Sequence, residues 1–165
     1  MLNRQSLLAV ALGLALLGAA PAPTTSITRP ATTTQPRIPK DAVEFNGHFY
    51  KAFEADLSWH EKKKRCEEMG GHLAVIETAE EQKFIARLAK GRYLSLGATD
   101  EHKEGDWRWV NGAPWKYTCW MAGQPNNYSG EEHYLATYDE GEWVDVAAEG
   151  SDFWMPTGFI CEWAP

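Results

Sequence analysis

Oxygen-bearing side chains crowd around one proline in the segment GQPNNYSGEEHYL, at residues 123–135. Gln124 and Asn126 flank Pro125, and Glu131 follows in the same segment. Amide and carboxylate oxygens suit Ca²⁺, because this hard cation binds six to eight oxygen atoms. The same groups can hydrogen-bond a ligand rich in hydroxyls, since amides donate and carboxylates accept. The segment therefore indicates a site for a cation, a polar ligand or both.

Catalytic motifs give no comparable signal. His60 and Glu61 resemble the start of the zinc-protease motif H-E-x-x-H, but Lys64 stands where the second histidine would be. The sequence also has no G-x-S-x-G, phosphate-loop or dinucleotide-binding pattern. Its five histidines are scattered along the chain, and we expect His133 to pack between strands. We therefore predict a protein that is not an enzyme.

Acidic residues gather in the last 125 residues, 41–165. All 23 of them lie there, with only 12 of the 16 lysines and arginines, which gives this part a formal charge of −11. Its length predicts one domain, and all eight tryptophans are available for an aromatic core. A surface this acidic excludes nucleic acid as a partner because it repels phosphates. Cations are better suited to it.

The first 40 residues carry targeting and tethering signals. Residues 1–20 combine Arg4 with an apolar run followed by small residues, a pattern typical of a secretory signal peptide. An uncleaved membrane anchor is the alternative. Residues 21–40 hold five prolines, six threonines and no acid, so they cannot bury enough apolar surface to fold. We expect a disordered linker there, a mature chain without a membrane-spanning segment, and a secreted, periplasmic or extracellular location.

The domain holds three cysteines, Cys66, Cys119 and Cys161. In an exported protein two of them are expected to pair, and we favour Cys66 with Cys161, which would join an early helix to the last strand. Closing a loop of this length contributes about 4–5 kcal/mol in the chain-entropy model. Cys119 is then either a buried thiol beside Trp120 or half of an intermolecular bridge.

Helix signals occupy the first half of the domain. A capping box of Ser58 and Glu61 predicts one helix, which the glycines at 70–71 end. A second box, of Thr78 and Glu81, predicts another that ends at residue 91. We expect the lysines at 62–64 to face water or to extend along the surface.

Short strands account for most of the remaining domain. A hairpin is indicated by alternating residues around the turn at Asn46 and Gly47. The other predicted strands are HLAVIE (72–77), YLSLGAT (93–99), DWRWVNG (106–112), HYLATY (133–138), EWVDV (142–146) and GFICEW (158–163). Long loops at 113–132 and 147–157 are typical of functional segments. Two helices and many short strands predict the α+β class.

Five segments, taken in order, resemble the C-type lectin domain over nearly all of 41–165. They are GGHLAVIET (70–78), LGATDEHKEGDWRWVNG (96–112), GQPNNYSGEEHYL (123–135), WVD (143–145) and FICEW (159–163). The resemblance implies a C-type lectin-like fold, in which two helices flank short antiparallel sheets with a long ligand-binding loop. It also implies a constant disulfide between Cys66 and Cys161. The family's second disulfide is absent, because His133 and Ala148 stand at its positions.

The same resemblance implies a combined metal and sugar site. Its residues here would be Gln124, Asn126, Glu131 and Asp145, with the peptide bond before Pro125 in cis. In the family, two sugar hydroxyls complete the shell of a Ca²⁺ ion and hydrogen-bond the same side chains.

Two departures from the family pattern predict a weak calcium site. Val144 stands where an asparagine precedes the aspartate, and it offers no side-chain oxygen. Gln-Pro-Asn also differs from the Glu-Pro-Asn of mannose-type members and the Gln-Pro-Asp of galactose-type members, and it leaves two carboxylates where both have three. Calcium affinity is tuned by the number of carboxylates. The sequence does not choose between the two sugar classes.

A neighbouring auxiliary metal site is implied at Asp100, Glu104, Asn127 and Glu132. The alternative is that Asp100 and Glu104 are turn residues with solvated charges.

We therefore predict a secreted carbohydrate-binding protein, with Ca²⁺ as a cofactor that is weak at the sugar site and a carbohydrate or glycoprotein as its partner. Tyr128 or Trp154 is a candidate to stack on the sugar. The alternative function is a calcium-independent protein-interaction module that uses the same loop face. The sequence leaves the sugar and the oligomeric state open.

Overall fold

A computed structural model describes residues 36–149 and 155–164. The signal peptide predicted at 1–20 and most of the linker predicted at 21–40 lie outside the described residues. Trp154, a candidate for stacking on a sugar, lies outside them as well. Among the described residues, no helix has the length and apolar content needed to cross a membrane.

The domain begins with the predicted hairpin. Strand β1 (Val43–Phe45) pairs antiparallel with β2 (His48–Glu54). Asn46 and Gly47 form the turn with φ of 50° and 83°, left-handed values that the Asn-Gly pair adopts readily. The alternating sequence and its turn residues therefore act together at this hairpin, and the prediction is confirmed.

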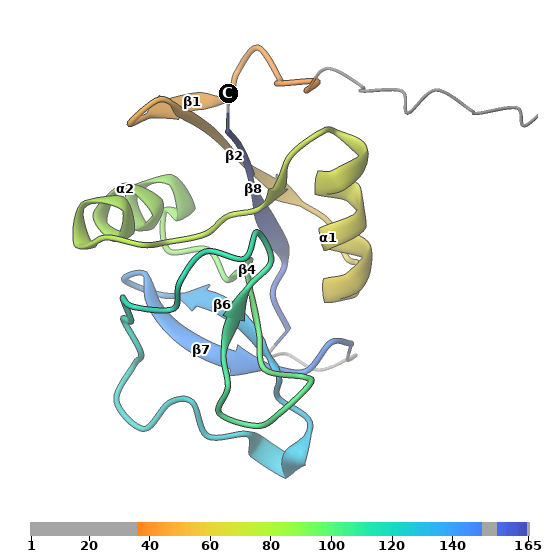
Figure 1. Cartoon of the computed structure of the whole chain (residues 1–165), viewed down its shortest axis with the longest axis vertical. Coiled ribbons are helices and arrows are strands. Elements are labelled where there is room, and N and C mark those ends of the chain that lie inside the picture. Colours follow the sequence, from red (N-terminus) through yellow and green to blue (C-terminus); the bar gives the residue numbers. More distant parts are fainter. Residues whose placement is uncertain (1–35, 150–154, 165) are drawn as a thin grey trace, which may run out of the picture. The chain divides into compact units, whose positions relative to one another are not determined.

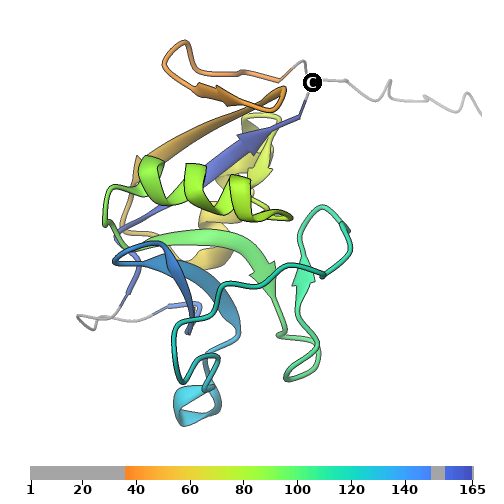
Figure 2. The same ribbon diagram turned by 90° about the vertical axis from the view of Figure 1, so that its left-hand side faces the viewer.

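Two helices cover opposite faces of the sheet around β2 and β8 (Figures 1 and 2). Helix α1 (Trp59–Glu68) begins at Ser58 with the complete predicted capping box. Helix α2 (Ala79–Ala89) begins at Thr78. There the box is incomplete, because the Glu81 carboxylate accepts the Glu77 N–H at 2.8 Å and the Tyr50 hydroxyl at 2.6 Å. Glu81 thus links α2 to the first hairpin.

The strands form one mixed sheet in the order β1-β2-β8-β4-β6-β7. The remaining strands are β3 (His72–Leu73), β4 (Leu94–Thr99), β5 (Arg108–Trp109), β6 (Tyr134–Tyr138), β7 (Glu142–Val146) and β8 (Gly158–Trp163). The strand pairs are antiparallel, as predicted, apart from β4 with β8, which is parallel. The α+β class and the C-type lectin-like arrangement of two helices around short strands are confirmed.

Strand β3 is also shorter than the predicted run at 72–77. Past Leu73 the Ala74 N–H still donates to the Ile160 carbonyl of β8 at 2.9 Å. The Val75 N–H instead donates to the Glu162 carboxylate at 2.9 Å, and the ladder with β8 ends there.

An aromatic cluster packs the long loop onto the sheet. Trp143 of β7 is fully buried, and Trp109, Trp115 and Trp120 lie within 5.8 Å of it, measured between ring centroids. Its indole N–H donates to Gln82 of α2 at 2.7 Å. The predicted aromatic core therefore lies under the loop that carries the oxygen-rich segment.

Lys62 corrects one expectation about α1. Its side chain is buried, at 1% exposed, whereas we expected it at the surface. The Nζ donates to the Pro156 carbonyl at 2.9 Å and to the Ser95 hydroxyl at 3.3 Å. Desolvation lowers the pKa of Lys62 to about 8, and the carboxylate of Asp56 opposes this shift. The sequence could not reveal that Lys62 is buried, because its hydrogen-bond partners Ser95 and Pro156 lie far from it along the chain.

Cys66 and Cys161 are buried free thiols that interact side by side, which joins α1 to β8 as the predicted bridge would. Burial raises the pKa of the Cys66 thiol, and the contact with Cys161 adds to the shift. Their covalent bond stays a prediction.

Candidate functional site

The oxygen-rich loop is fixed to the sheet by one carboxylate. Asp145 lies on β7 and is 3% exposed. It accepts the backbone N–H of Asn126 at 3.0 Å and that of Asn127 at 2.6 Å. The peptide bond between Gln124 and Pro125 is cis, as predicted. The turn around the proline is therefore anchored on the strand that supplies the last predicted ligand.

The structure brings all four predicted metal and sugar residues to one groove of about 740 Å³. They are Gln124, Asn126, Glu131 and Asp145. Two further carboxylates, Glu132 and Glu149, line the same groove, and no lysine or arginine does so among the described residues. A groove lined by one sign of charge concentrates the opposite ion. Its walls therefore favour a cation.

One polar atom in this groove has no partner. The side-chain oxygen Oε1 of Gln124 is buried and accepts no hydrogen bond within the described part of the chain. Leaving such an acceptor unpaired costs about 1–3 kcal/mol. A cation, or the hydroxyl of a bound ligand, would remove that cost, and both lie within the chemistry of the groove.

Calcium fits these residues in part. Gln124, Glu131 and Asp145 can offer oxygens, and the loop that carries two of them is already in place. Val144 also lines the groove but presents only methyl groups, so the ligand lost in the sequence is lost in space. Both oxygens of Asp145 already accept backbone N–H groups. The donor set therefore suits a weakly held ion.

Tyr128 supplies an aromatic surface at the rim of the groove. It begins the short helix η1 (Tyr128–Gly130) and is 72% exposed, unusual for a large aromatic side chain in this domain. Exposed tyrosine offers a flat apolar face with a polar tip. It can therefore contact a ligand that mixes apolar faces with hydroxyls.

The predicted auxiliary site is assembled only in part. Asp100 and Glu104 lie together, and the side-chain amide of Asn127 donates to the Glu104 carboxylate. The Asn127 side-chain oxygen meanwhile accepts the Glu132 N–H at 3.1 Å. In this arrangement Asn127 turns its NH₂ group toward Glu104, which is not the orientation of a metal ligand.

Glu132 lies in the groove and outside this cluster. Its carboxylate accepts the Tyr128 N–H at 3.0 Å. Desolvation raises the pKa of Glu132, the hydrogen bond from Tyr128 lowers it, and the charge of Asp145 raises it further. Glu132 is therefore an acid of the groove and not of the auxiliary cluster.

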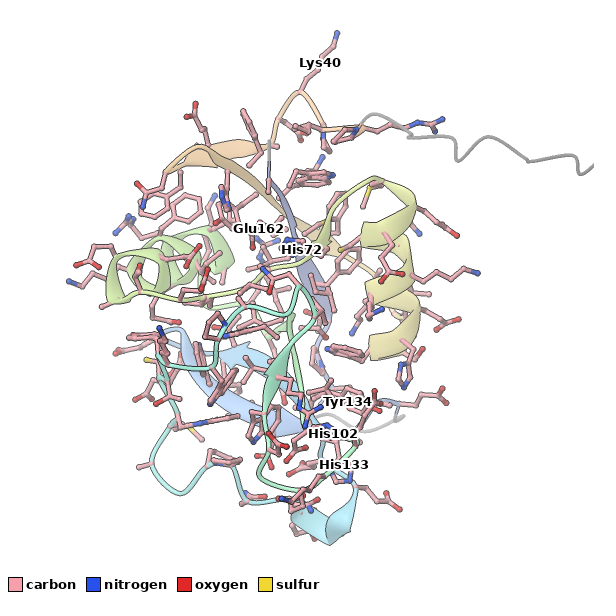
Figure 3. All side chains as sticks on the ribbon, viewed as in Figure 1. Lys40, His72, His102, His133, Tyr134 and Glu162 are labelled. Atoms are coloured by element: carbon pink, nitrogen blue, oxygen red, sulfur yellow. The ribbon has the colours of Figure 1, made fainter. Side chains whose placement is uncertain are left out.

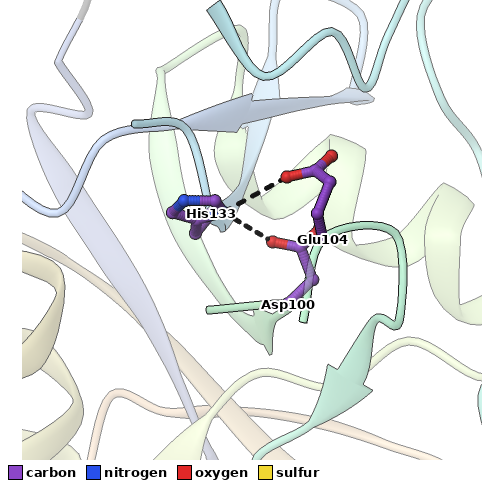
Figure 4. Close-up of side chains that lie close together, drawn as sticks. All are labelled: Asp100, Glu104 and His133. Carbon is purple, nitrogen blue, oxygen red and sulfur yellow. Dashed lines mark hydrogen bonds and ion pairs between the residues drawn. The ribbon is translucent and has the colours of Figure 1, made fainter. Parts of the chain in front are cut away.

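His133 joins Asp100 and Glu104 in its place (Figure 4). The Nδ1 atom of His133 lies 3.1 Å from Asp100 and 3.5 Å from Glu104. The expectation that His133 packs between strands was therefore wrong.

The orientation of His133 follows from its place next to Glu132 in an extended segment. The chain at His133 continues the backbone ladder, since its N–H donates to Val146 at 3.1 Å and its carbonyl accepts from Asp100 at 3.2 Å. Successive side chains of an extended segment point to opposite sides. Glu132 therefore faces the groove and His133 faces the acids.

Another buried carboxylate with histidine neighbours lies elsewhere. Glu162 of β8 is 2.6 Å from His48 and 3.9 Å from His72. Figure 3 shows Glu162 and His72 near the middle of the molecule, away from the end where His133 lies. Burial raises the pKa of Glu162 against the opposing charge of His72. This cluster organises the sheet and takes no part in the groove.

The fold and the groove together define a ligand-binding module whose long loop lies on a mixed sheet between two helices. Residues 55–162 match the family model described as the Lectin C-type domain. The chain belongs to the C-type lectin domain family.

Individual relatives agree with this assignment. The chain is similar to hepatic lectin of Gallus gallus, with 36% identity over 104 residues, which cover 62% of this chain and 50% of the relative. The match spans between 29% and 50% of the length of the first curated relatives. Among solved structures it is similar to the carbohydrate-recognition domain of the mouse scavenger receptor C-type lectin. That match has a TM-score of 0.69 and 30% identity, and it covers 76% of this chain and 97% of the other.

A second solved structure is the cow C-type carbohydrate-recognition domain of CD23, obtained in the presence of a GlcNAc2Man3 oligosaccharide. The TM-score is 0.71 and the identity 26%, with 77% of this chain and 95% of the other covered.

Proposed function

We propose that this protein binds carbohydrate in the groove around Gln124, with a weakly held Ca²⁺ ion assisting the contact. The observation that carries the proposal is the buried, unpartnered Oε1 of Gln124, which lines a groove shared with Glu131 and Asp145. The groove combines acceptors for sugar hydroxyls with carboxylates that attract a cation. The family assignment and the carbohydrate-recognition relatives support the same ligand class.

The residues of the groove have different roles in this proposal. Gln124 and Asn126 can donate through their NH₂ groups to a sugar hydroxyl, and the Glu131 carboxylate can accept one. Asp145 positions the loop through its bonds to Asn126 and Asn127. Bound calcium would supply positive charge that orients the hydroxyl oxygens. A hydroxyl facing Val144 would stay unpaired at a cost of about 1–3 kcal/mol, so the preferred sugar places none there.

Calcium dependence is tested by thermal unfolding in Ca²⁺ and in EDTA, followed by a glycan array under both conditions. At a concentration of about 100 times Kd, the ion adds roughly 2.7 kcal/mol to the free energy of unfolding. For a weak site with a Kd of about 1 mM, we expect a gain of about 1 kcal/mol at roughly 5 mM Ca²⁺ and the larger value only near 100 mM. The absence of any gain, together with no glycan binding in either condition, would remove the proposal.

Restoring the missing ligand sharpens the test. We expect Val144→Asn, alone or with Gln124→Glu, to bind Ca²⁺ more tightly, because each change returns an oxygen or a charge to the groove. The matched control is Val144→Ala, which removes the valine methyls without adding an oxygen. Isothermal titration with CaCl₂ measures all variants. Equal affinities for the asparagine and alanine variants would show that residue 144 does not face the ion.

A calcium-independent protein-interaction module is the second candidate. It is favoured by the Asp145 contacts, which hold the loop without an ion. Ligand capture that EDTA does not change, by a protein stripped of its glycans, would support this candidate over the lectin.

Export of the chain belongs to the same proposal and rests on residues 1–20 of the sequence. Mass spectrometry of the protein recovered outside the producing cell would reveal whether this segment has been removed.

A further inference from the structure

We propose that Asp100, Glu104 and His133 form a site for a divalent transition-metal ion such as Zn²⁺, in which His133 is the nitrogen ligand. This site goes beyond the calcium-assisted groove and does not depend on it. It lies between the turn that follows β4 and the chain entering β6 (Figure 4).

The spacing of the three side chains suits a small ion. The Nδ1 atom of His133 lies 3.1 Å from Asp100 Oδ1 and 3.5 Å from Glu104 Oε2. One ligand atom from each residue lies within 4.8 Å of the others. Ligands held at about 2.0–2.2 Å around a tetrahedral Zn²⁺ are separated by roughly 3.3–3.6 Å. Small movements would therefore bring all three into contact with one ion.

The charge of Asp100 independently points to a cation. Its side chain is 1% exposed, and no lysine or arginine pairs with it among the described residues. One oxygen accepts the Gly105 N–H at 2.7 Å, while the other faces only the His133 ring. Buried carboxylates are normally paired with a cation or bound to a metal. The His133 ring and the neutral Asn127 amide, which donates to Glu104, leave the charge of the two carboxylates incompletely balanced.

The donor set selects a transition metal over calcium. Calcium takes oxygen ligands, whereas imidazole suits zinc, copper and nickel. Glu132, which would have added a third carboxylate, is turned into the groove, and Asn127 presents its NH₂ group to Glu104. Two carboxylates and one imidazole remain, with an open position for water.

Such an ion would connect two loops beside the groove. His133 stands where the C-type lectin resemblance places a cysteine of a second disulfide. A bound metal would therefore fasten the end of the 123–133 segment that this missing bridge leaves free.

Titration calorimetry with ZnCl₂ on the metal-stripped protein at pH 7 tests the site. We expect one saturable site. Loss of a residue that only supports a metal ligand already lowers affinity by roughly 10–100-fold, so His133→Ala, which removes a ligand itself, should lower it by at least that much. The matched control is His102→Ala. This partly exposed histidine pairs with Asp106 at 3.1 Å in the same turn, and its loss should leave the affinity within about twofold.

Two further measurements make the outcome decisive. Glu104 is 55% exposed at its side chain, so Glu104→Gln should preserve the fold if the histidine variant does not, and it too should weaken Zn²⁺. Co²⁺ should give visible d–d absorption that Ca²⁺ in equal amount does not abolish. The inference is overturned if Zn²⁺ shows no saturable binding, if both variants bind as tightly as the parent, or if Ca²⁺ displaces the ion equally well. Gln124→Ala should keep Zn²⁺ binding while losing glycan, so the two proposals fail separately.

Discussion

Replacing Asp145 with asparagine tests whether this carboxylate holds the loop in the absence of any ion. Three contacts at 2.6–3.0 Å join its two oxygens to the N–H groups of Asn126 and Asn127. The asparagine keeps the shape but puts an NH₂ group against one of these donors. A hydrogen bond to a charged group contributes about 1.5–3 kcal/mol, and an unpaired buried N–H adds its own cost. We therefore expect Asp145→Asn to lose about 2–4 kcal/mol of stability in EDTA.

Chemical and thermal unfolding in EDTA, both followed by circular dichroism, measure this loss. For a domain of this size 1 kcal/mol corresponds to roughly 3–5 °C in Tm, so the expected drop is about 10 °C. Glu142→Gln is the control, because Glu142 is an exposed carboxylate on the same strand and should change stability by less than about 0.5 kcal/mol. An asparagine variant as stable as this control in EDTA would refute the reasoning and leave the loop dependent on a ligand or ion.

Two further perturbations concern the core. Burial lowers the pKa of Lys62 from 10.5 in the unfolded chain to about 8. The folded state is therefore penalised fully below pH 8, and the penalty fades as pH rises to 10.5. Between pH 8 and 10.5 we expect the free energy of unfolding of the parent to rise by on the order of 3 kcal/mol relative to that of Lys62→Met. Urea unfolding at each pH measures both proteins. A difference that does not change with pH would contradict the prediction. Oxidation should join Cys66 to Cys161 and raise the free energy of unfolding by about 4 kcal/mol over that of the reduced protein. The stability of the control variant Cys161→Ser should not depend on reductant. A parent whose stability is equally insensitive to reductant would rule the bridge out.

Local sequence signals predicted the elements of this fold well. Ser58 with Glu61, and Asn46 with Gly47, act over a few residues, so their effect can be read without knowing the tertiary structure. Lys62 and the shortened β3 strand were missed for the opposite reason. Their backbone and side-chain partners, such as Pro156 and Glu162, come from distant parts of the chain.

The candidate site divides in the same way. The residues around Pro125 were predicted by resemblance, and they share a groove because Asp145 binds the turn directly. The auxiliary cluster depended on which side of the chain Glu132 and His133 would face. Neighbouring residues of an extended segment point to opposite sides. Matching positions to the family therefore did not show that His133, and not Glu132, faces Asp100 and Glu104.

The pairing of β2 with β8 brings the two ends of the domain together, which determines where a support or tag can be attached. Strand β1 and the C-terminal end of β8 lie at one end of the domain, and the short helix η1 at the groove lies at the other (Figures 1 and 2). A solid support, a reporter or an oligomerisation tag joined at either end would leave the groove facing outward. Several copies displayed this way could reach one multivalent surface together, and weak single contacts would then add up to durable adhesion.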